Sequence, residues 1–164
     1  MGQGPILAMI LLLFAGLVIA LLGVAALPRF YVMPAVAGLC AVGAVSVLGF
    51  LAFSAESSEI AVPLGLPGGS MRLALDGLSG VFLLLLFVTA SACAVHGHGE
   101  PGPLFPLFVA AMALALLAAD AFTLLLGFEA MSLASWAAIL VRHEETASRE
   151  AALLYVGMAA FSAA

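Results

Sequence analysis

Residues 104–141 read LFPLFVAAMALALLAADAFTLLLGFEAMSLASWAAILV, and this stretch decides the fold of the chain. It has 38 residues and is almost entirely apolar. As a single helix that rises about 1.5 Å per residue, it would be about twice as long as a membrane is thick. The stretch must therefore fold back on itself, and Asp120 is the only charged residue near its midpoint. We predict two membrane spans here, at about 104–119 and 121–141.

The composition of the whole chain predicts an integral membrane protein. Of its 164 residues, 66% are hydrophobic and 8% are charged, and the mean hydropathy is +1.32. Soluble domains carry about a quarter of charged residues, so these values exclude that class. A net charge of −5 excludes nucleic acid as the main partner. The two cysteines exclude a disulfide framework, and their spacing does not indicate a zinc site.

Four further apolar runs complete the predicted fold, an all-α, polytopic bundle of transmembrane helices, with spans at about 5–27, 34–53, 77–95 and 150–164. A signal peptide is the rival interpretation of the first run, but no basic residue precedes it and the run is long for a signal. Pro34 fits the first turn of the second span. The last run is too short to cross a membrane. We therefore expect five complete spans and a truncated sixth, in the N-terminal part of a larger subunit.

The longest connection, residues 54–76, carries the signature of a small β-hairpin. Two stretches of alternating apolar and polar residues, Ile60 to Leu64 and Met71 to Leu75, flank the turn-forming sequence Pro67-Gly68-Gly69. Pro63 restricts the first strand to an edge position.

The four arginines predict the orientation. With alternating spans, three of them share one side of the membrane and Arg72 lies on the other. Positive residues favour the cytoplasmic side, so we expect the N-terminus outside and the hairpin on the extracytoplasmic side.

Glu129 is the ionisable residue that a membrane span should not contain. It lies about eight residues, or about 12 Å, inside the predicted span 121–141, near the middle of the bilayer. A charged carboxylate at that depth costs roughly 2.5 to 3.5 kcal/mol, so such residues usually face a bundle interior or a hydrated cavity. Burial raises the pKa of a carboxyl group and a nearby cation lowers it, and a group between these influences can relay protons. The alternative is a protonated glutamate that only packs against a neighbouring helix.

Helical spacing places two polar or aromatic residues on the same face as Glu129. Ser132 follows it by three residues and Trp136 by seven. We expect Ser132 to form a hydrogen bond with the carboxyl group and Trp136 to form a wall of the site. Asp76 and Asp120 each precede an apolar run, which is typical of helix N-caps.

The remaining polar residues are interpreted as structural. His96, His98 and Glu100 alternate with glycines, and we interpret this segment as an interfacial turn in preference to a metal site. Residues 142–149 are predicted to be a solvated loop of mixed charge. No phosphate-binding loop, nucleophile elbow or catalytic triad pattern is present in the sequence. We expect no catalytic site, no metal and no cofactor in this chain.

Two stretches, RLALDGLS (72–79) and ADAFTLLLGFEAMSLASW (119–136), resemble the antiporter-like membrane subunits of respiratory complex I and its relatives. Those relatives include the multisubunit sodium/proton antiporters and the membrane-bound nickel-iron hydrogenases. The second stretch is most similar to the branch formed by the antiporter-like subunits of hydrogenase-4 and of formate hydrogenlyase. Residues 150–155 (EAALLY) are similar to the start of the family's sixth helix. The first two spans match only in layout.

This resemblance implies about fourteen helices in two inverted repeats, with the N-terminus outside and an external hairpin after the second span. It implies that Glu129 pairs with a lysine on the seventh helix and passes protons onward. The chain departs from the family in having Phe128 where tryptophan is frequent, and in containing no lysine.

The implied partners are other membrane subunits of a redox or antiporter complex, the lipid bilayer and, indirectly, hydrophilic redox subunits. The implied location is the bacterial inner membrane. Quinone reduction, hydrogen chemistry and iron-sulfur clusters would belong to the partner subunits.

The leading hypothesis is an ion-translocating membrane subunit of a complex I-like assembly. The transported ion is a proton, with sodium as the alternative. A self-contained cation/proton antiporter and a structural or assembly protein are the competing hypotheses.

Overall fold

The computed structural model describes residues 29–53, 58–62, 71–97, 104–141 and 143–163. The elements in these residues are, in chain order, α2 (Arg29–Phe53), β1 (Ser58–Val62), β2 (Met71–Leu75), α3 (Gly77–His96), α4 (Leu104–Leu117), α5 (Ala121–Leu140) and α6 (Thr146–Ala163). The predicted span 5–27 lies outside the described residues.

Three helices in the described residues are long and apolar enough to cross a membrane. They are residues Tyr31–Ala52 of α2, and the whole of α3 and α5. α4 is also apolar but has 14 residues, so it is about 21 Å long and shorter than the hydrocarbon core of a bilayer. These lengths and compositions support a helical membrane protein.

Two helices begin earlier than the apolar runs predict. α2 begins at Arg29, five residues before the predicted start, so Pro34 lies inside the helix and not in its first turn. Val32 and Met33 are buried, and their packing stabilises the helix here although Pro34 has no backbone N–H to donate. α6 begins at Thr146, within the predicted polar loop and before its apolar run. The backbone N–H of Arg149 donates to the carbonyl of Glu145 (3.2 Å) in this polar first turn.

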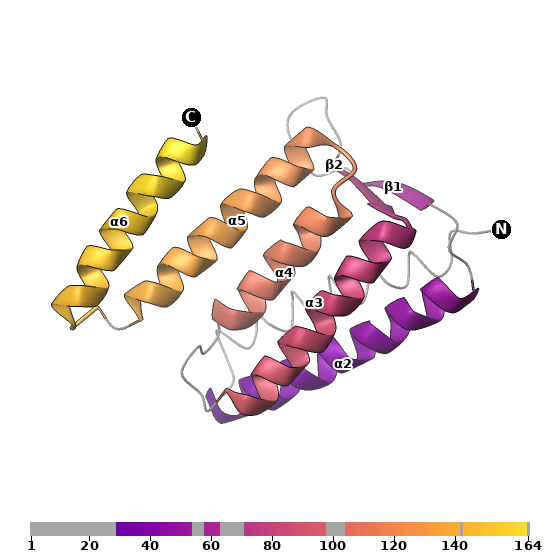
Figure 1. The fold of residues 1–164 in the computed structure, drawn as a ribbon, viewed down its shortest axis with the longest axis horizontal. Coiled ribbons are helices and arrows are strands. Elements are labelled where there is room, and N and C mark those ends of the chain that lie inside the picture. The colour runs from indigo at the N-terminus through magenta and orange to yellow at the C-terminus, as the bar shows by residue number, and fades with distance from the viewer. Residues whose placement is uncertain (1–28, 54–57, 63–70, 98–103, 142, 164) are drawn as a thin grey trace.

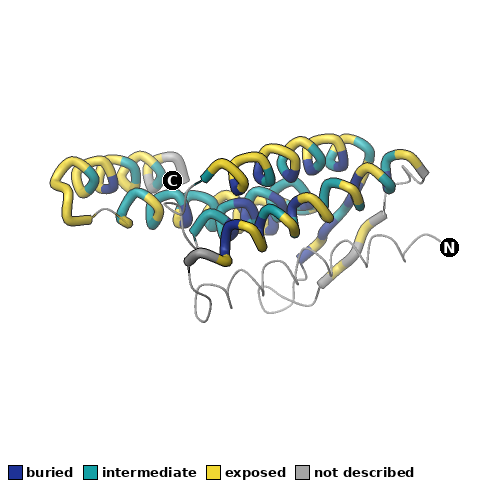
Figure 2. The backbone as a smooth tube through the Cα atoms, turned by 90° about the horizontal axis from the view of Figure 1, so that it is seen from below, coloured by how far each residue is buried: buried dark blue, intermediate teal, exposed yellow. Residues whose placement is uncertain are grey.

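The helices lie side by side in a row (Figure 1). α2 packs along α3, α4 packs along α5, and α6 packs against α5. The starts of α3 and α5 and the end of α4 gather beside the two strands. Many residues on the outer sides of this row are exposed (Figure 2), as expected for helices that meet lipid or further protein.

The main cluster of buried apolar side chains lies between α2, α3, α4 and β2. Its most buried members are Val47 of α2 and Leu83 of α3, both 0% exposed. Leu73 and Leu75 of β2 belong to it as well, so the strand closes one end of the helical core. Among the described residues, no side chain of α5 belongs to this cluster.

The two strands pair antiparallel, with Ser58 opposite Leu75 and Val62 opposite Met71. The second strand has its predicted bounds, whereas the first lies two residues earlier than predicted and ends before Pro63. Along β2 the buried side chains alternate with more exposed ones, so one face of the strand lies on the core. The predicted turn at residues 67–69 lies outside the described residues.

Candidate functional site

Asp120 begins the helix that carries Glu129. Its backbone is extended, and its Oδ1 accepts a hydrogen bond from the Thr123 N–H (2.8 Å). The Asp120 carbonyl accepts the first helical hydrogen bond, from the Leu124 N–H (3.0 Å). The predicted N-cap is therefore present, and it fixes the start of α5 at Ala121.

One side of α5 consists of small residues and lies against α4. A Cβ atom added at Gly127 would lie 2.9 Å from the Cα atom of Ala115 in α4, so the two backbones are in close contact. Thr123, Gly127 and Ala134 are the buried residues of α5. Small residues let membrane helices approach this closely, and their position identifies the side of α5 that faces α4.

Glu129 lies on the opposite side of α5. Two residues after Gly127 correspond to a rotation of about 200° around the helix. The Glu129 side chain is exposed, and so are Leu125 and Leu133, one helical turn before and after it. Within the described part of the chain, Glu129 makes no hydrogen bond or ion pair. The carboxyl group therefore faces away from α4 and is exposed.

Ser132 and Trp136 are half-buried on the same side of α5. The predicted hydrogen bond between Ser132 and Glu129 is not formed in the described structure. Another serine of this helix does form a hydrogen bond. Ser135 Oγ donates to the carbonyl of Met131 (2.9 Å). The wall formed by Trp136 remains a prediction.

Asp76 caps α3 in the way that Asp120 caps α5. Its Oδ1 accepts a hydrogen bond from the Ser79 N–H (2.7 Å), and the Gly80 N–H donates to its carbonyl (2.9 Å). Both predicted caps are therefore present in the structure.

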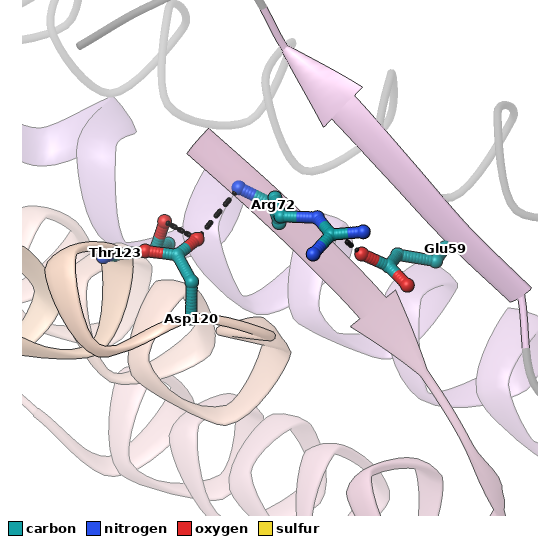
Figure 3. A network of polar contacts seen from close by, with 4 residues as sticks. All are labelled: Glu59, Arg72, Asp120 and Thr123. Atoms are coloured by element: carbon teal, nitrogen blue, oxygen red, sulfur yellow. Dashed lines mark hydrogen bonds and ion pairs between the residues drawn. The ribbon is translucent and has the colours of Figure 1, made fainter. Parts of the chain in front are cut away.

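Asp120 has a second contact that the sequence does not reveal. Its Oδ2 accepts hydrogen bonds from the Thr123 hydroxyl (2.6 Å) and from the backbone N–H of Arg72 (2.8 Å), as Figure 3 shows. The Arg72 side chain turns the other way and forms an ion pair with Glu59 (Nε to Oε1, 2.7 Å). Thr123 is 0% exposed, and its hydroxyl is satisfied by this bond.

These hydrogen bonds stabilise the charged form of both carboxyl groups. The pKa of Asp120 is lowered, first by the Thr123 hydroxyl and then by the backbone N–H groups of Thr123 and Arg72. The pKa of Asp76 is lowered mainly by the backbone N–H of Ser79. Both aspartates are therefore anionic at neutral pH, as suits the positive end of a helix.

The described residues contain no group of three or more His, Cys, Asp or Glu side chains that could hold a metal ion. Of the three residues in the predicted interfacial turn, His96 is described, at the end of α3, and the other two lie outside the described residues. Cys40 is buried and Cys93 exposed, and both are free thiols.

No model of a known protein family matches this chain, and no match is found among curated proteins. The functional interpretation therefore depends on the residues themselves.

Proposed function

We propose that this chain is an ion-translocating membrane subunit of a complex I-like or membrane-bound hydrogenase-type redox assembly, in which Glu129 is the protonatable coupling residue. The observation that supports it best is the position of this carboxyl group. It lies nine residues after the helix cap, about 13 Å along α5, within a segment long enough to cross a membrane.

The apolar surroundings of Glu129 on α5 indicate that its carboxyl group has a partner within the membrane. Exposed Leu125 and Leu133 flank the carboxyl group, and facing lipid alone it would cost several kcal/mol. A cationic or hydrogen-bonding group on another membrane helix would remove that cost. The resemblance to the antiporter-like subunits assigns this role to a lysine of a later helix.

The rest of the assignment follows from the same resemblance. Other membrane subunits bind this one, and hydrophilic redox subunits supply the energy without contacting Glu129. The protein lies in the bacterial inner membrane with its N-terminus and hairpin outside. Its own residues translocate a proton or a sodium ion, and the oxidation and reduction steps take place on the partners.

The test is proton translocation by the complete subunit in its native assembly, in closed membrane vesicles. Glu129→Gln keeps the size of the side chain but cannot bind and release a proton. We expect it to abolish the pH gradient while the subunit still assembles. Glu144→Gln is the matched control, because Glu144 is exposed in the loop between α5 and α6. An unchanged pH gradient in Glu129→Gln would refute the proposal.

Two further outcomes distinguish the alternatives. If Glu129→Gln transports normally while Glu129→Ala weakens assembly, Glu129 is a packing residue. Ion exchange by the isolated protein, with no redox subunit present, would instead identify a secondary transporter.

A further inference from the structure

β2 has a bonded neighbour on each of its two edges. One edge pairs with β1, in the register that places Ala61 opposite Arg72. On the other edge, both backbone groups of Arg72 bind the turn between α4 and α5. Its N–H donates to Asp120 Oδ2 (2.8 Å), and its carbonyl accepts from the Ala119 N–H (2.9 Å). A bridge between Leu73 and Ala118 continues this pairing.

The two carboxylate oxygens of Asp120 serve different elements. Oδ1 binds the Thr123 N–H at the start of α5, whereas Oδ2 binds the Arg72 N–H of the strand and the Thr123 hydroxyl (Figure 3). The carboxylate therefore joins the first turn of α5 to β2. Asp76 has no such second role, because among the described residues its side chain bonds only at the start of α3.

β2 is held in place by the apolar core, so an element bound to it is also held in place. Leu73 and Leu75 are 2% and 1% exposed in the apolar core, so the strand cannot shift without disturbing α2, α3 and α4. Asp76 follows the strand directly and caps α3. One strand thus fixes the starts of both α3 and α5, and Asp120 provides the side-chain link to α5.

We propose that Asp120 is a positioning residue for Glu129: by holding the start of α5 against β2, it sets the height and the rotation of that helix in the membrane. The inference rests on the proposed function, in which Glu129 is the coupling residue. Glu129 lies about 13 Å beyond Asp120 on the same rigid helix, so a change at the link moves the carboxyl group relative to its partners.

Asparagine separates the two tasks of Asp120. It caps helices about as well as aspartate, so Asp120→Asn keeps the bond from the Thr123 N–H to one oxygen. Its amide NH₂ then takes the place of Oδ2 and faces the Arg72 N–H, and two donors cannot bond. Asp76→Asn is the matched control, because it makes the same chemical change at a cap without a link to the strand.

The first readout is the distance between the hairpin and α5 in the complete protein in lipid vesicles. Spin labels at Ala61 and Ala138, both exposed, are measured by electron–electron double resonance after Cys40 and Cys93 are replaced by alanine. We expect Asp120→Asn to broaden the distance distribution and to raise the undocked population about fivefold, as for loss of one ordinary hydrogen bond. Asp76→Asn leaves the distribution unchanged.

The second readout is the pH profile of proton translocation by the native assembly. A displaced Glu129 has a different electrostatic environment, so Asp120→Asn shifts the midpoint of the profile, whereas Asp76→Asn does not. A lower rate at every pH with the same midpoint would show that Asp120 affects only the amount of folded protein, and would overturn the positioning role.

The two proposals fail in different ways. A distance distribution that is identical in Asp120→Asn and wild type refutes the link, whatever Glu129 does. Normal transport by Glu129→Gln refutes the proposed function, and with it the purpose of the link, while the distance measurement still decides whether Asp120 holds α5 in place.

Discussion

Gly127 and Ala115 bring the backbones of α5 and α4 into contact. A Cβ atom at Gly127 would lie 2.9 Å from both the Cα and the nitrogen of Ala115, closer than such atoms approach in proteins. Because these are backbone atoms, no side-chain movement relieves the clash. The two helices can only move apart, and Glu129 would move with α5.

Gly127→Ala is therefore expected to destabilise the protein by about 1 to 3 kcal/mol, the usual cost of overpacking. Gly157→Ala in α6 is the control, because a Cβ atom there meets nothing within 4 Å. Equilibrium unfolding in detergent micelles measures both variants. Equal stability of the two would show that α4 and α5 do not pack as closely as described.

Ser91→Ala tests the contact between α3 and α2. Ser91 Oγ donates across the interface to the carbonyl of Ala37 (3.2 Å). Thr89 Oγ1 instead donates to the carbonyl of Leu85 within its own helix (2.8 Å). Hydrogen bonds between membrane helices contribute about 0.6 kcal/mol on average. We expect Ser91→Ala to lower the unfolding free energy by about that amount, and Thr89→Val to lower it by less. The reverse order would contradict the assigned partners.

The two capping aspartates predict loss of stability in acid. Each has a lowered pKa in the folded protein, so its stabilising contribution is fully present above the unfolded value, 3.8. That contribution is lost as the pH falls through the folded pKa, where the carboxylates become protonated. Thermal unfolding followed from about pH 6 to about pH 3 should show this decline. It should be smaller in the double variant Asp76→Asn with Asp120→Asn, and an identical decline would refute the assignment.

The bond between Arg72 and Asp120 can be removed from either end. Arg72→Pro deletes the donor N–H, and Arg72→Ala keeps it while removing the ion pair with Glu59. The exposed ion pair contributes little, so Arg72→Ala should be close to wild type.

The measurement is hydrogen exchange at the Ala119 N–H, which binds the Arg72 carbonyl. Arg72→Pro and Asp120→Asn should each speed exchange about fivefold, the factor for one hydrogen bond. Combining them should add little, because they remove the same bond. Fully additive effects would mean that the two residues act independently.

Features set by local sequence could be predicted. The caps at Asp76 and Asp120 follow from a carboxylate placed directly before an apolar run, and α3 and α5 begin where those caps require. The strand Met71–Leu75 follows from its alternating pattern, because one of its faces lies on the core.

Features set by distant contacts could not be predicted. The start of α2 depends on the burial of Val32 and Met33, which outweighs the signal from Pro34. The partner of Asp120 is a backbone N–H 48 residues earlier, and nearly every residue carries such a group. Helical spacing groups Ser132 with Glu129, but it does not fix their side-chain geometry, and no hydrogen bond joins them.

The pairing of β2 with the turn before α5 also has a consequence for how the protein is made. Arg72 is synthesised 48 residues before Asp120, a delay of roughly 2 to 10 s at usual rates of translation. During that time the outer edge of β2 has no partner from the turn. It gains one only when the turn between α4 and α5 has been made and reaches the strand. The contact between β2 and this turn is therefore formed late, after α3 and α4 have been made.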